Sequence, residues 1–199
     1  MKKYDLLSKI RKKNPYRQIA RANQEHRRLK NILNREFSWI LPYQKLGTDI
    51  SYLHFNWMKA YISILKDMIT WEVLSYKLSG NLWIWFVLKT ISEAQIPNRE
   101  WVIIQSDQWY HYTHPKYQKL LKDFWIIQSM SRRWNCLDNA PTESFFWHLK
   151  DEIDISSCKN LNDLGLYIEN YIHHYNYERP QWDRKKMTPV QYRNHLLDS

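Results

Sequence analysis

Three consecutive runs rich in β-branched and aromatic residues open the part of the chain that we expect to fold. We predict that they are strands, at residues 45–55, 59–69 and 72–78. The pairs Asn56-Trp57 and Thr70-Trp71 fall where the chain must reverse between these strands. Strands joined in this way form a meander, in which neighbours in sequence lie side by side in one sheet.

Helical and strand-like patterns alternate after the meander. We predict helices at residues 81–95, 114–123, 161–177 and 189–197, and further strands at residues 101–107 and 125–129. Three apolar residues in a row, Val102-Ile103-Ile104, indicate that the strand at 101–107 is buried on both faces. A meander followed by helices, another strand and further helices is an α+β pattern.

Two of these helices carry apolar residues at helical spacing, which we expect to face the core. In the first helix the candidates are Phe86, Leu88 and Ile91. In the helix at 161–177 the apolar stripe consists of Leu161, Leu164, Tyr167, Ile168, Tyr171 and Tyr175.

A polar loop from Ser131 to Pro141 leads into another predicted helix. Asn139 is a candidate N-cap, and Pro141 is acceptable in a first helical turn. One face of this helix is apolar and consists of Phe145, Leu149 and Ile153. A different face carries residues at i, i+4 and i+7, namely Glu143, Trp147 and Lys150. An acid and an amine on one helix face are usually no more than a surface pair.

Two acids in predicted strands change that interpretation. Asp49 lies in the run at 45–55, and Asp107 ends the strand at 101–107. An acid at the edge of a buried strand must be paired, hydrogen-bonded or bound to a metal ion. Taken singly, Asp49 could accept a local hydrogen bond and Asp107 could begin a turn. Together with Glu143, they can form a carboxylate cluster for divalent metal ions.

The spacing of these acids carries a family resemblance. Residues 108–142, which number 35, separate Asp107 from Glu143, and six residues, 144–149, separate Glu143 from Lys150. Further short matches are Thr48-Asp49-Ile50-Ser51-Tyr52-Leu53, Ser106-Asp107-Gln108, Ser129-Met130-Ser131, Asp138-Asn139-Ala140, Glu143-Ser144-Phe145-Phe146, and Tyr175-Asn176 with Arg179-Pro180. From about residue 12 to its end, the chain resembles the catalytic subunit of bacterial insertion-sequence transposases with a retroviral-integrase-like DDE core.

The resemblance implies a ribonuclease-H-like fold, in which helices flank a mixed five-stranded sheet (α+β, or α/β in three layers). We expect this catalytic core, with its C-terminal helices, at residues 39–199 and a basic helical arm at residues 1–38. The arm is either a DNA-contacting segment or a solvated linker that happens to be basic. Similar transposases carry a helix-turn-helix region upstream of the core. We find no full copy here, so we expect it in a separate upstream reading frame or lost by truncation.

The resemblance also implies an activity and its residues. We expect metal-dependent cleavage of DNA at the ends of an insertion sequence and transfer of those ends to target DNA. Asp49, Asp107 and Glu143 would be the catalytic residues and the ligands of two Mg²⁺ ions, with Mn²⁺ as a substitute. Two such ions, roughly 3.5–4 Å apart, activate the attacking oxygen and stabilise the leaving one. Asp49 would bridge both ions, and no organic cofactor is implied.

Four basic residues are candidates for contacts with DNA: Lys150, Arg132, Arg133 and Arg179. The family implies a homo-oligomer that holds two element ends in one complex. Two alternatives remain open. The first is a catalytically inactive DNA-binding relic or regulator with the same fold, against which the retained acids argue. The second is a simple nuclease of this fold, which would need neither the basic arm nor a paired-end complex.

The resemblance implies a DNA-binding protein of the bacterial cytoplasm that associates with the nucleoid, and the charge and cysteine content agree with this. The 199 residues carry a formal net charge of +10, which favours a polyanionic partner. The two cysteines, Cys136 and Cys158, lack the spacing of metal ligands and imply no disulfide framework. The longest apolar run, Leu82–Leu88, is far too short to cross a membrane.

Tryptophan and glycine occur in unusual numbers, 11 and 3 respectively. Asn56-Trp57 lies at a predicted reversal, where Asn-Gly is the strongest hairpin signal. The predicted turns and the family resemblance suggest glycine at ten of the eleven tryptophan positions: Trp39, Trp57, Trp71, Trp83, Trp85, Trp101, Trp109, Trp125, Trp134 and Trp147. Trp182 alone resembles a true tryptophan. Ten exchanges would raise glycine from 3 to 13 of 199 residues, close to the usual ~7%. We hypothesise that UGA codons meant as glycine are written here as tryptophan; decay of the element by real substitutions is the alternative.

Overall fold

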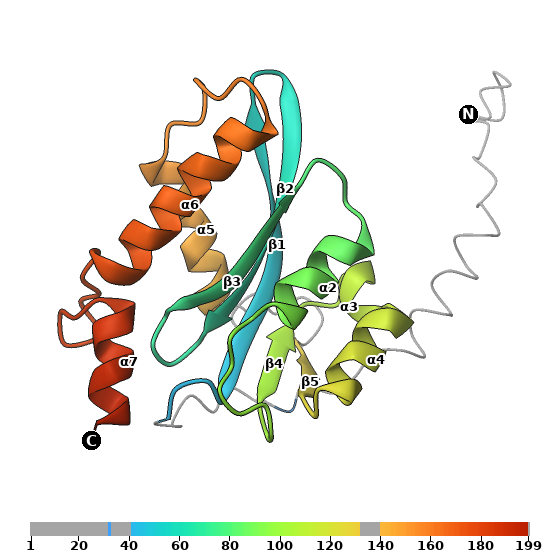
Figure 1. Ribbon diagram of the computed structural model, residues 1–199, viewed down its shortest axis with the longest axis vertical. Helices are drawn as coiled ribbons and strands as arrows, with labels where there is room; N and C mark the ends of the chain where they lie inside the picture. The colour runs from blue at the N-terminus through green and yellow to red at the C-terminus, as the bar shows by residue number, and fades with distance from the viewer. Residues whose placement is uncertain (1–31, 33–40, 132–139, 199) are drawn as a thin grey trace, which may run out of the picture.

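The computed structural model describes residue 32, residues 41–131 and residues 140–198 (Figure 1). The basic arm predicted at 1–38 therefore lies almost entirely outside the described residues. So do the candidate cap Asn139 and the candidate DNA contacts Arg132 and Arg133.

Five strands form one mixed sheet. They are β1 (Lys45–Phe55), β2 (Met58–Asp67), β3 (Val73–Ser79), β4 (Ile103–Ser106) and β5 (Ile127–Met130). Their order across the sheet is β3-β2-β1-β4-β5. The meander of β1, β2 and β3 is antiparallel, whereas β4 pairs with β1 and β5 pairs with β4 in parallel. The mixed five-stranded sheet expected from the sequence is thereby confirmed.

Helices cover both faces of this sheet. They are α2 (Ile84–Ser92), α3 (Tyr110–Thr113), α4 (Pro115–Asp123), α5 (Ala140–Glu152), α6 (Leu161–Tyr177) and α7 (Pro189–Leu197). All but α3 were predicted within a few residues; α3 is a single turn, too short to show helical periodicity. Among the described residues, no helix is long and apolar enough to cross a membrane.

Strict alternation along β1 assigns its side chains to two cores. Leu46 and Ile50 belong to the cluster that packs with α2, α3 and α4. Leu53 and Phe55, at odd positions, belong to the cluster that packs with α5 and α6. Figure 1 shows these two helix groups on opposite sides of the sheet. Because side chains alternate across a strand, Asp49 points toward the α5 side.

The predicted apolar stripes are largely confirmed. Phe86, Leu88 and Ile91 of α2 are buried, as are Phe145 and Leu149 of α5. The stripe of α6 is narrower than its spacing suggested. Its buried members are Leu164, Ile168, Tyr171 and Tyr175, whereas Leu161 and Tyr167 are exposed at 37% and 45%. Leu161 is the first residue of α6, and Tyr167 lies at the edge of the buried stripe.

Both predicted reversals of the meander are confirmed. Phe55 pairs with Met58, so Asn56 and Trp57 alone form the β1–β2 turn. Their φ angles are 38° and 61°, and positive values at both positions define the type I′ hairpin turn. The β2–β3 turn contains Trp71 at φ 70°. A residue with a Cβ pays roughly 1–2 kcal/mol for this left-handed backbone.

Candidate active site

Two acids lie side by side on adjacent parallel strands, Asp49 within β1 and Asp107 just after the carboxyl end of β4. The last registered pair of β1 and β4 is Gly47 with Gln105, and Asp49 and Asp107 each lie two residues further along. The parallel register therefore brings the two acids to the same level of the sheet. Open sheets with parallel strands bind ligands at this carboxyl edge.

Each acid is held by a backbone N–H of its own segment. The Ile50 N–H donates to Asp49 Oδ1 at 2.8 Å, and the Trp109 N–H donates to Asp107 Oδ1 at 2.8 Å. The second bond explains why Asp107 follows β4 instead of continuing it: the acid caps the turn that leads into α3. These bonds fix the orientation of both carboxylates.

Helix α5 brings the third acid, Glu143, in its first turn. The helix packs against β1, and Gly47 permits the close approach. A Cβ at position 47 would overlap the hydroxyl of Thr142 and would lie 3.0 Å from Met68 Cε. The absence of a side chain at Gly47 therefore determines how near Glu143 comes to Asp49.

The three carboxylates influence one another. Burial, and then the charges of Asp107 and Glu143, raise the pKa of Asp49 to about 8 against the opposing effects of the Ile50 hydrogen bond and Lys150. Burial followed by the charge of Glu143 raises the pKa of Asp107, and burial raises the pKa of Glu143. Without a cation the acids repel one another, and a bound divalent ion would remove that repulsion.

A pocket of about 230 Å³ joins β1 to α5. It is lined by Asp49, Ser51, Glu143, Phe146, Trp147 and Lys150. The face of α5 predicted to carry Glu143, Trp147 and Lys150 is therefore the face that meets Asp49. The Lys150 Nζ lies 5.0 Å from the ring centroid of Tyr52, which keeps this exposed ammonium beside the pocket.

Sequence reasoning did not assign Ser51 or Phe146 to this pocket. Simple spacing could have found both. Ser51 follows Asp49 by two residues and so points to the same face of β1, and Phe146 follows Glu143 by three residues along α5.

The donor set suits a hard divalent cation, because all three candidate ligands are carboxylates. In the described part of the chain, however, no group of three or more His, Cys, Asp or Glu side chains is arranged to hold a metal ion. The acids are electrostatically coupled but do not form a closed ligand set in this conformation. Their chemistry fits Mg²⁺.

Arg179 has partners away from the three acids. Its Nη2 atom donates to Glu152 Oε1 at 2.8 Å, and the Tyr171 hydroxyl donates to Glu152 Oε2 at 3.1 Å. Arg179 thus links the segment after α6 to the last residue of α5. Of the two predicted DNA contacts that the structure describes, Lys150 lies beside the acids and Arg179 does not; Arg132 and Arg133 are outside the described residues.

Curated relatives cover most of this chain. It is 36% identical over 167 residues to InsK of insertion sequence element IS150 from Escherichia coli K12, covering 82% of this chain and 59% of InsK. It is 35% identical over 171 residues to a transposase-like protein of Haemophilus influenzae, covering 84% of this chain and 79% of that protein. The chain belongs to the insertion-sequence transposases. It spans less than two thirds of the InsK length.

Two further comparisons agree with this family. The family model of the integrase core domain matches residues 143–197 of the transposase, beginning at Glu143. The HTLV-2 integrase catalytic core in complex with magnesium superposes with a TM-score of 0.59 at 14% identity, covering 77% of this chain and 98% of that one. A chain of the simian T-cell lymphotropic virus intasome, solved with PP2A regulatory subunit B56 gamma, gives 0.59 at 14%, covering 78% and 55%. The predicted ribonuclease-H-like fold is confirmed.

Proposed function

We propose that this transposase cleaves DNA at the ends of an insertion sequence and joins those ends to target DNA. The supporting observation is the meeting of three coupled acids where β1 and β4 run parallel and α5 begins. Asp49, Asp107 and Glu143 would be its catalytic residues. A simple nuclease of the same fold has less support, because the relatives that cover most of the chain are transposases or transposase-like.

The same three carboxylates would hold the divalent metal, Mg²⁺ or Mn²⁺, as two ions. When bound, such ions neutralise phosphate charge, activate the attacking oxygen and stabilise the leaving one. The chain itself holds the carboxylates in place through the Ile50 and Trp109 N–H groups and through the contact of α5 with β1. No covalent intermediate with the protein is needed.

Lys150 would position the DNA. Its ammonium is exposed beside the pocket that Asp49 and Glu143 line, where a phosphate of the element's end would lie next to the metal. A lysine at such a place contributes charge and orientation but reads no base sequence. Arg132, Arg133 and Arg179 would make further phosphate contacts, the last only if its pair with Glu152 opens.

The remaining parts of the proposal concern assembly. The matched viral chain belongs to an intasome. We infer a comparable homo-oligomer here, with two element ends bound together. The basic arm at 1–38 would bind DNA, and a helix-turn-helix protein from an upstream frame would supply end recognition. All of this would take place at the nucleoid of a bacterial cell.

Strand transfer with purified protein tests the catalytic assignment. Asp49→Asn, Asp107→Asn and Glu143→Gln should each abolish Mg²⁺-dependent cleavage and joining while DNA binding survives, because Lys and Arg supply phosphate contacts. Asp151→Asn is the matched control, since this exposed acid lies on the same helix. Full activity in any of the three variants would remove that residue from the site.

A catalytically inactive relic is the alternative to test alongside. It would bind DNA but fail to cleave it even with all three acids intact. The assay therefore uses two proteins: the parent chain and a variant with glycine at Trp147 and at the tryptophans of positive φ, Trp57, Trp71, Trp101 and Trp125. The variant ensures that a site obstructed by the Trp147 side chain is not mistaken for an inactive one.

A further inference from the structure

Several tryptophans in this chain have the left-handed backbone conformation that is usual for glycine. Among the described residues, eight that are not glycine have clearly positive φ, and four of them are tryptophans. These are Trp57, Trp71, Trp101 and Trp125, with φ of 61°, 70°, 64° and 59°. None of the three glycines has positive φ. Bulky side chains are outliers in this region, which glycine occupies without penalty.

Trp57 occupies the second position of a two-residue type I′ turn. Asn56 precedes it, also at positive φ, and Phe55 and Met58 close the hairpin. Asn-Gly is the preferred pair for this turn because both residues must be left-handed. The Trp57 side chain is fully exposed, so no packing compensates for the backbone strain.

Trp125 follows the C-cap of helix α4, at the position where glycine is most characteristic. The Ile126 N–H donates to the Leu121 carbonyl at 2.9 Å, and the Trp125 N–H donates to the Lys122 carbonyl at 3.0 Å. This pair of bonds defines the Schellman motif, whose left-handed residue is usually glycine. Trp125 is that residue, and its side chain is 79% exposed.

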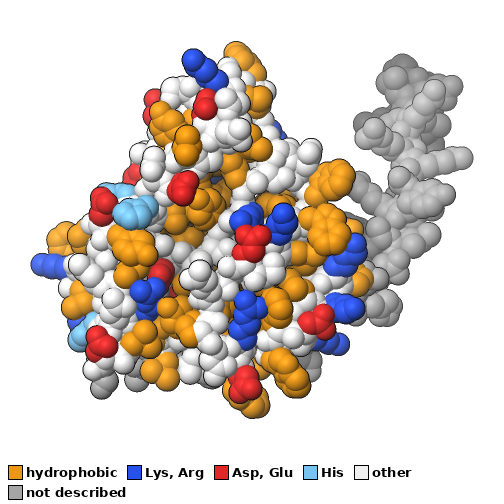
Figure 2. All heavy atoms as spheres, in the orientation of Figure 1, with side chains coloured by type: hydrophobic (Ala, Val, Ile, Leu, Met, Phe, Trp, Pro, Cys, Tyr) orange, Lys and Arg blue, Asp and Glu red, His pale blue; other side chains and the backbone are white. Residues whose placement is uncertain are grey.

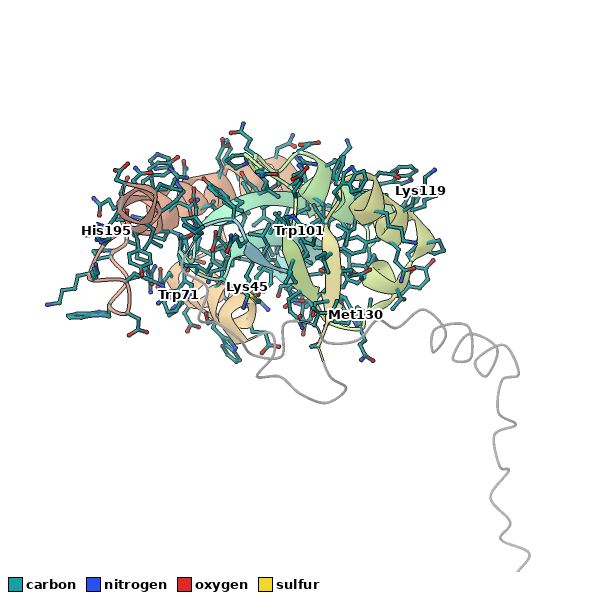
Figure 3. All side chains as sticks on the ribbon, turned by 90° about the horizontal axis from the view of Figure 1, so that it is seen from below. Lys45, Trp71, Trp101, Lys119, Met130 and His195 are labelled. Atoms are coloured by element: carbon teal, nitrogen blue, oxygen red, sulfur yellow. The ribbon has the colours of Figure 1, made fainter. Side chains whose placement is uncertain are left out.

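Trp71 and Trp101 occupy two further left-handed positions. Trp71 donates its N–H to the Asp67 carbonyl at 3.0 Å in the β2–β3 turn, and Trp101 precedes β4 and is 75% exposed. Figure 3 shows these two side chains well apart along the same end of the molecule, so they do not form one aromatic cluster. The four positions belong to separate turns and share only their backbone conformation.

The other described tryptophans, apart from Trp182, lie at helix starts or on exposed helix surfaces. Trp83 and Trp109 are N-caps without a capping side-chain hydrogen bond. Glycine is common at N-caps and tryptophan is not. Trp85 and Trp147 are exposed on helices. In Figure 2 large hydrophobic side chains are visible on the surface over α2.

We propose that the native residue at the four left-handed tryptophan positions is glycine, encoded by UGA codons that the source organism reads as glycine. The same codon would account for the other six positions predicted from the sequence, of which Trp39 and Trp134 lie outside the described residues. Trp182 is the exception, because the sequence analysis suggests a true tryptophan there and the structure does not place it at positive φ. Random substitution would not select four unrelated left-handed turn positions. The inference concerns backbone geometry and does not depend on the proposed DNA chemistry.

The proposal has a consequence at the acidic pocket. Trp147 lines it beside Asp49 and Glu143 with 70% of its surface exposed. Glycine at 147 would leave that side of the pocket open between Glu143 and Lys150. The native site would therefore admit a DNA strand where the printed sequence places an indole ring.

The coding DNA gives the first test. We expect UGA at the ten positions and UGG at Trp182. Peptide masses from the source cells should show glycine at position 125. UGG at any of the four left-handed positions, or tryptophan at 125 in the native peptide, would overturn the proposal.

Protein stability gives an independent test. The triple variant Trp57→Gly/Trp101→Gly/Trp125→Gly should raise the folded-to-unfolded ratio roughly two- to fivefold per site, as relief of strain exceeds the added freedom of the unfolded chain. The control Trp182→Gly should lower that ratio, because no strain is relieved there. If the parent chain does not fold, a cooperative unfolding transition gained by the triple variant is the supporting result.

The contrary results are equally definite. A triple variant that is less stable than its parent, or that still lacks a transition, would overturn the proposal. A glycine variant that is stable but cannot join DNA would instead count against the proposed function and leave the recoding intact.

Discussion

Two acids on neighbouring strands, the partly buried Asp49 of β1 and the buried Asp67 of β2, have opposite surroundings. The Asp67 carboxylate accepts three backbone N–H groups, from Tyr43 at 2.6 Å, Ile69 at 2.7 Å and Thr70 at 3.1 Å. Asp49 accepts one, from Ile50, and is exposed to the charges of two other acids. Burial raises the pKa of both, but around Asp67 hydrogen bonds oppose it, and around Asp49 neighbouring charges add to it.

The difference separates a structural acid from one available for chemistry. The hydrogen bonds of Asp67 join backbone groups of the fold itself: Ile69 and Thr70 in the β2–β3 turn and Tyr43 before β1. Asp49 accepts a single hydrogen bond, from the Ile50 N–H, and the nearby charges of Asp107 and Glu143 disfavour its carboxylate. A bound cation would offset that repulsion. Functional sites commonly sacrifice stability in this way. The same substitution, Asp to Asn, should therefore have opposite consequences at the two positions.

Asp49→Asn carries the largest expected effect, and the effect is on activity. Loss of one carboxylate from the metal site should reduce joining by roughly 10²–10³-fold or more. In the presence of a chelator the free energy of unfolding should stay unchanged or rise slightly, because the amide relieves repulsion with Asp107 and Glu143. Strand-transfer rates and urea unfolding measure the two quantities. A clear loss of stability would show that Asp49 is structural as well.

Asp67→Asn should act in the opposite way. An amide nitrogen in place of Oδ2 cannot accept the Tyr43 N–H, and an unpaired buried donor costs about 1–3 kcal/mol. We expect a loss of this size in urea unfolding, with activity per folded molecule retained. Activity lost at full stability would place Asp67 in the catalytic machinery and break the distinction.

Gly47→Ala tests how the third acid reaches Asp49. The added Cβ would displace Thr142 and the first turn of α5, at a cost of about 1–3 kcal/mol, typical of overpacking. Because Glu143 follows Thr142, we also expect a higher Mg²⁺ concentration for half-maximal joining. Gly80→Ala is the control, since a Cβ there meets no atom within 4 Å. An unchanged Mg²⁺ requirement would show that α5 tolerates the displacement.

Sequence reasoning located Asp49 and overlooked Asp67, for a physical reason. Asp49 was found through the strand-like run at 45–55 and the family match from Thr48 to Leu53, both of which need no tertiary structure. The contact of Asp67 with Tyr43 spans 24 residues and joins a strand end to the segment before β1. No local pattern indicates such a bond.

The elements show the same limit. A run rich in β-branched and aromatic residues located β1 at its observed bounds, but Trp101 and Val102, counted in the predicted strand at 101–107, precede β4. Because Trp101 has a left-handed backbone, β4 begins only at Ile103. A tryptophan in the sequence does not suggest such a turn. The pocket was predicted in part. The face of α5 that lines it was identified correctly. The close approach of α5 to β1 was not, because it depends on the contact of Gly47 with Thr142, which only the tertiary structure shows.

Lys150→Ala should have the smallest effect, since it removes only one phosphate interaction. Without that interaction, the slope of log affinity against log salt should fall by about one unit. The measurement is a titration of affinity for the element's end at several salt concentrations. Lys119→Ala on α4, also exposed, is the matched control and should leave the slope unchanged if α4 does not touch DNA (Figure 3). Equal slopes for both variants and the parent would show that Lys150 makes no phosphate contact, and the three acids alone would then remain as the proposed site residues.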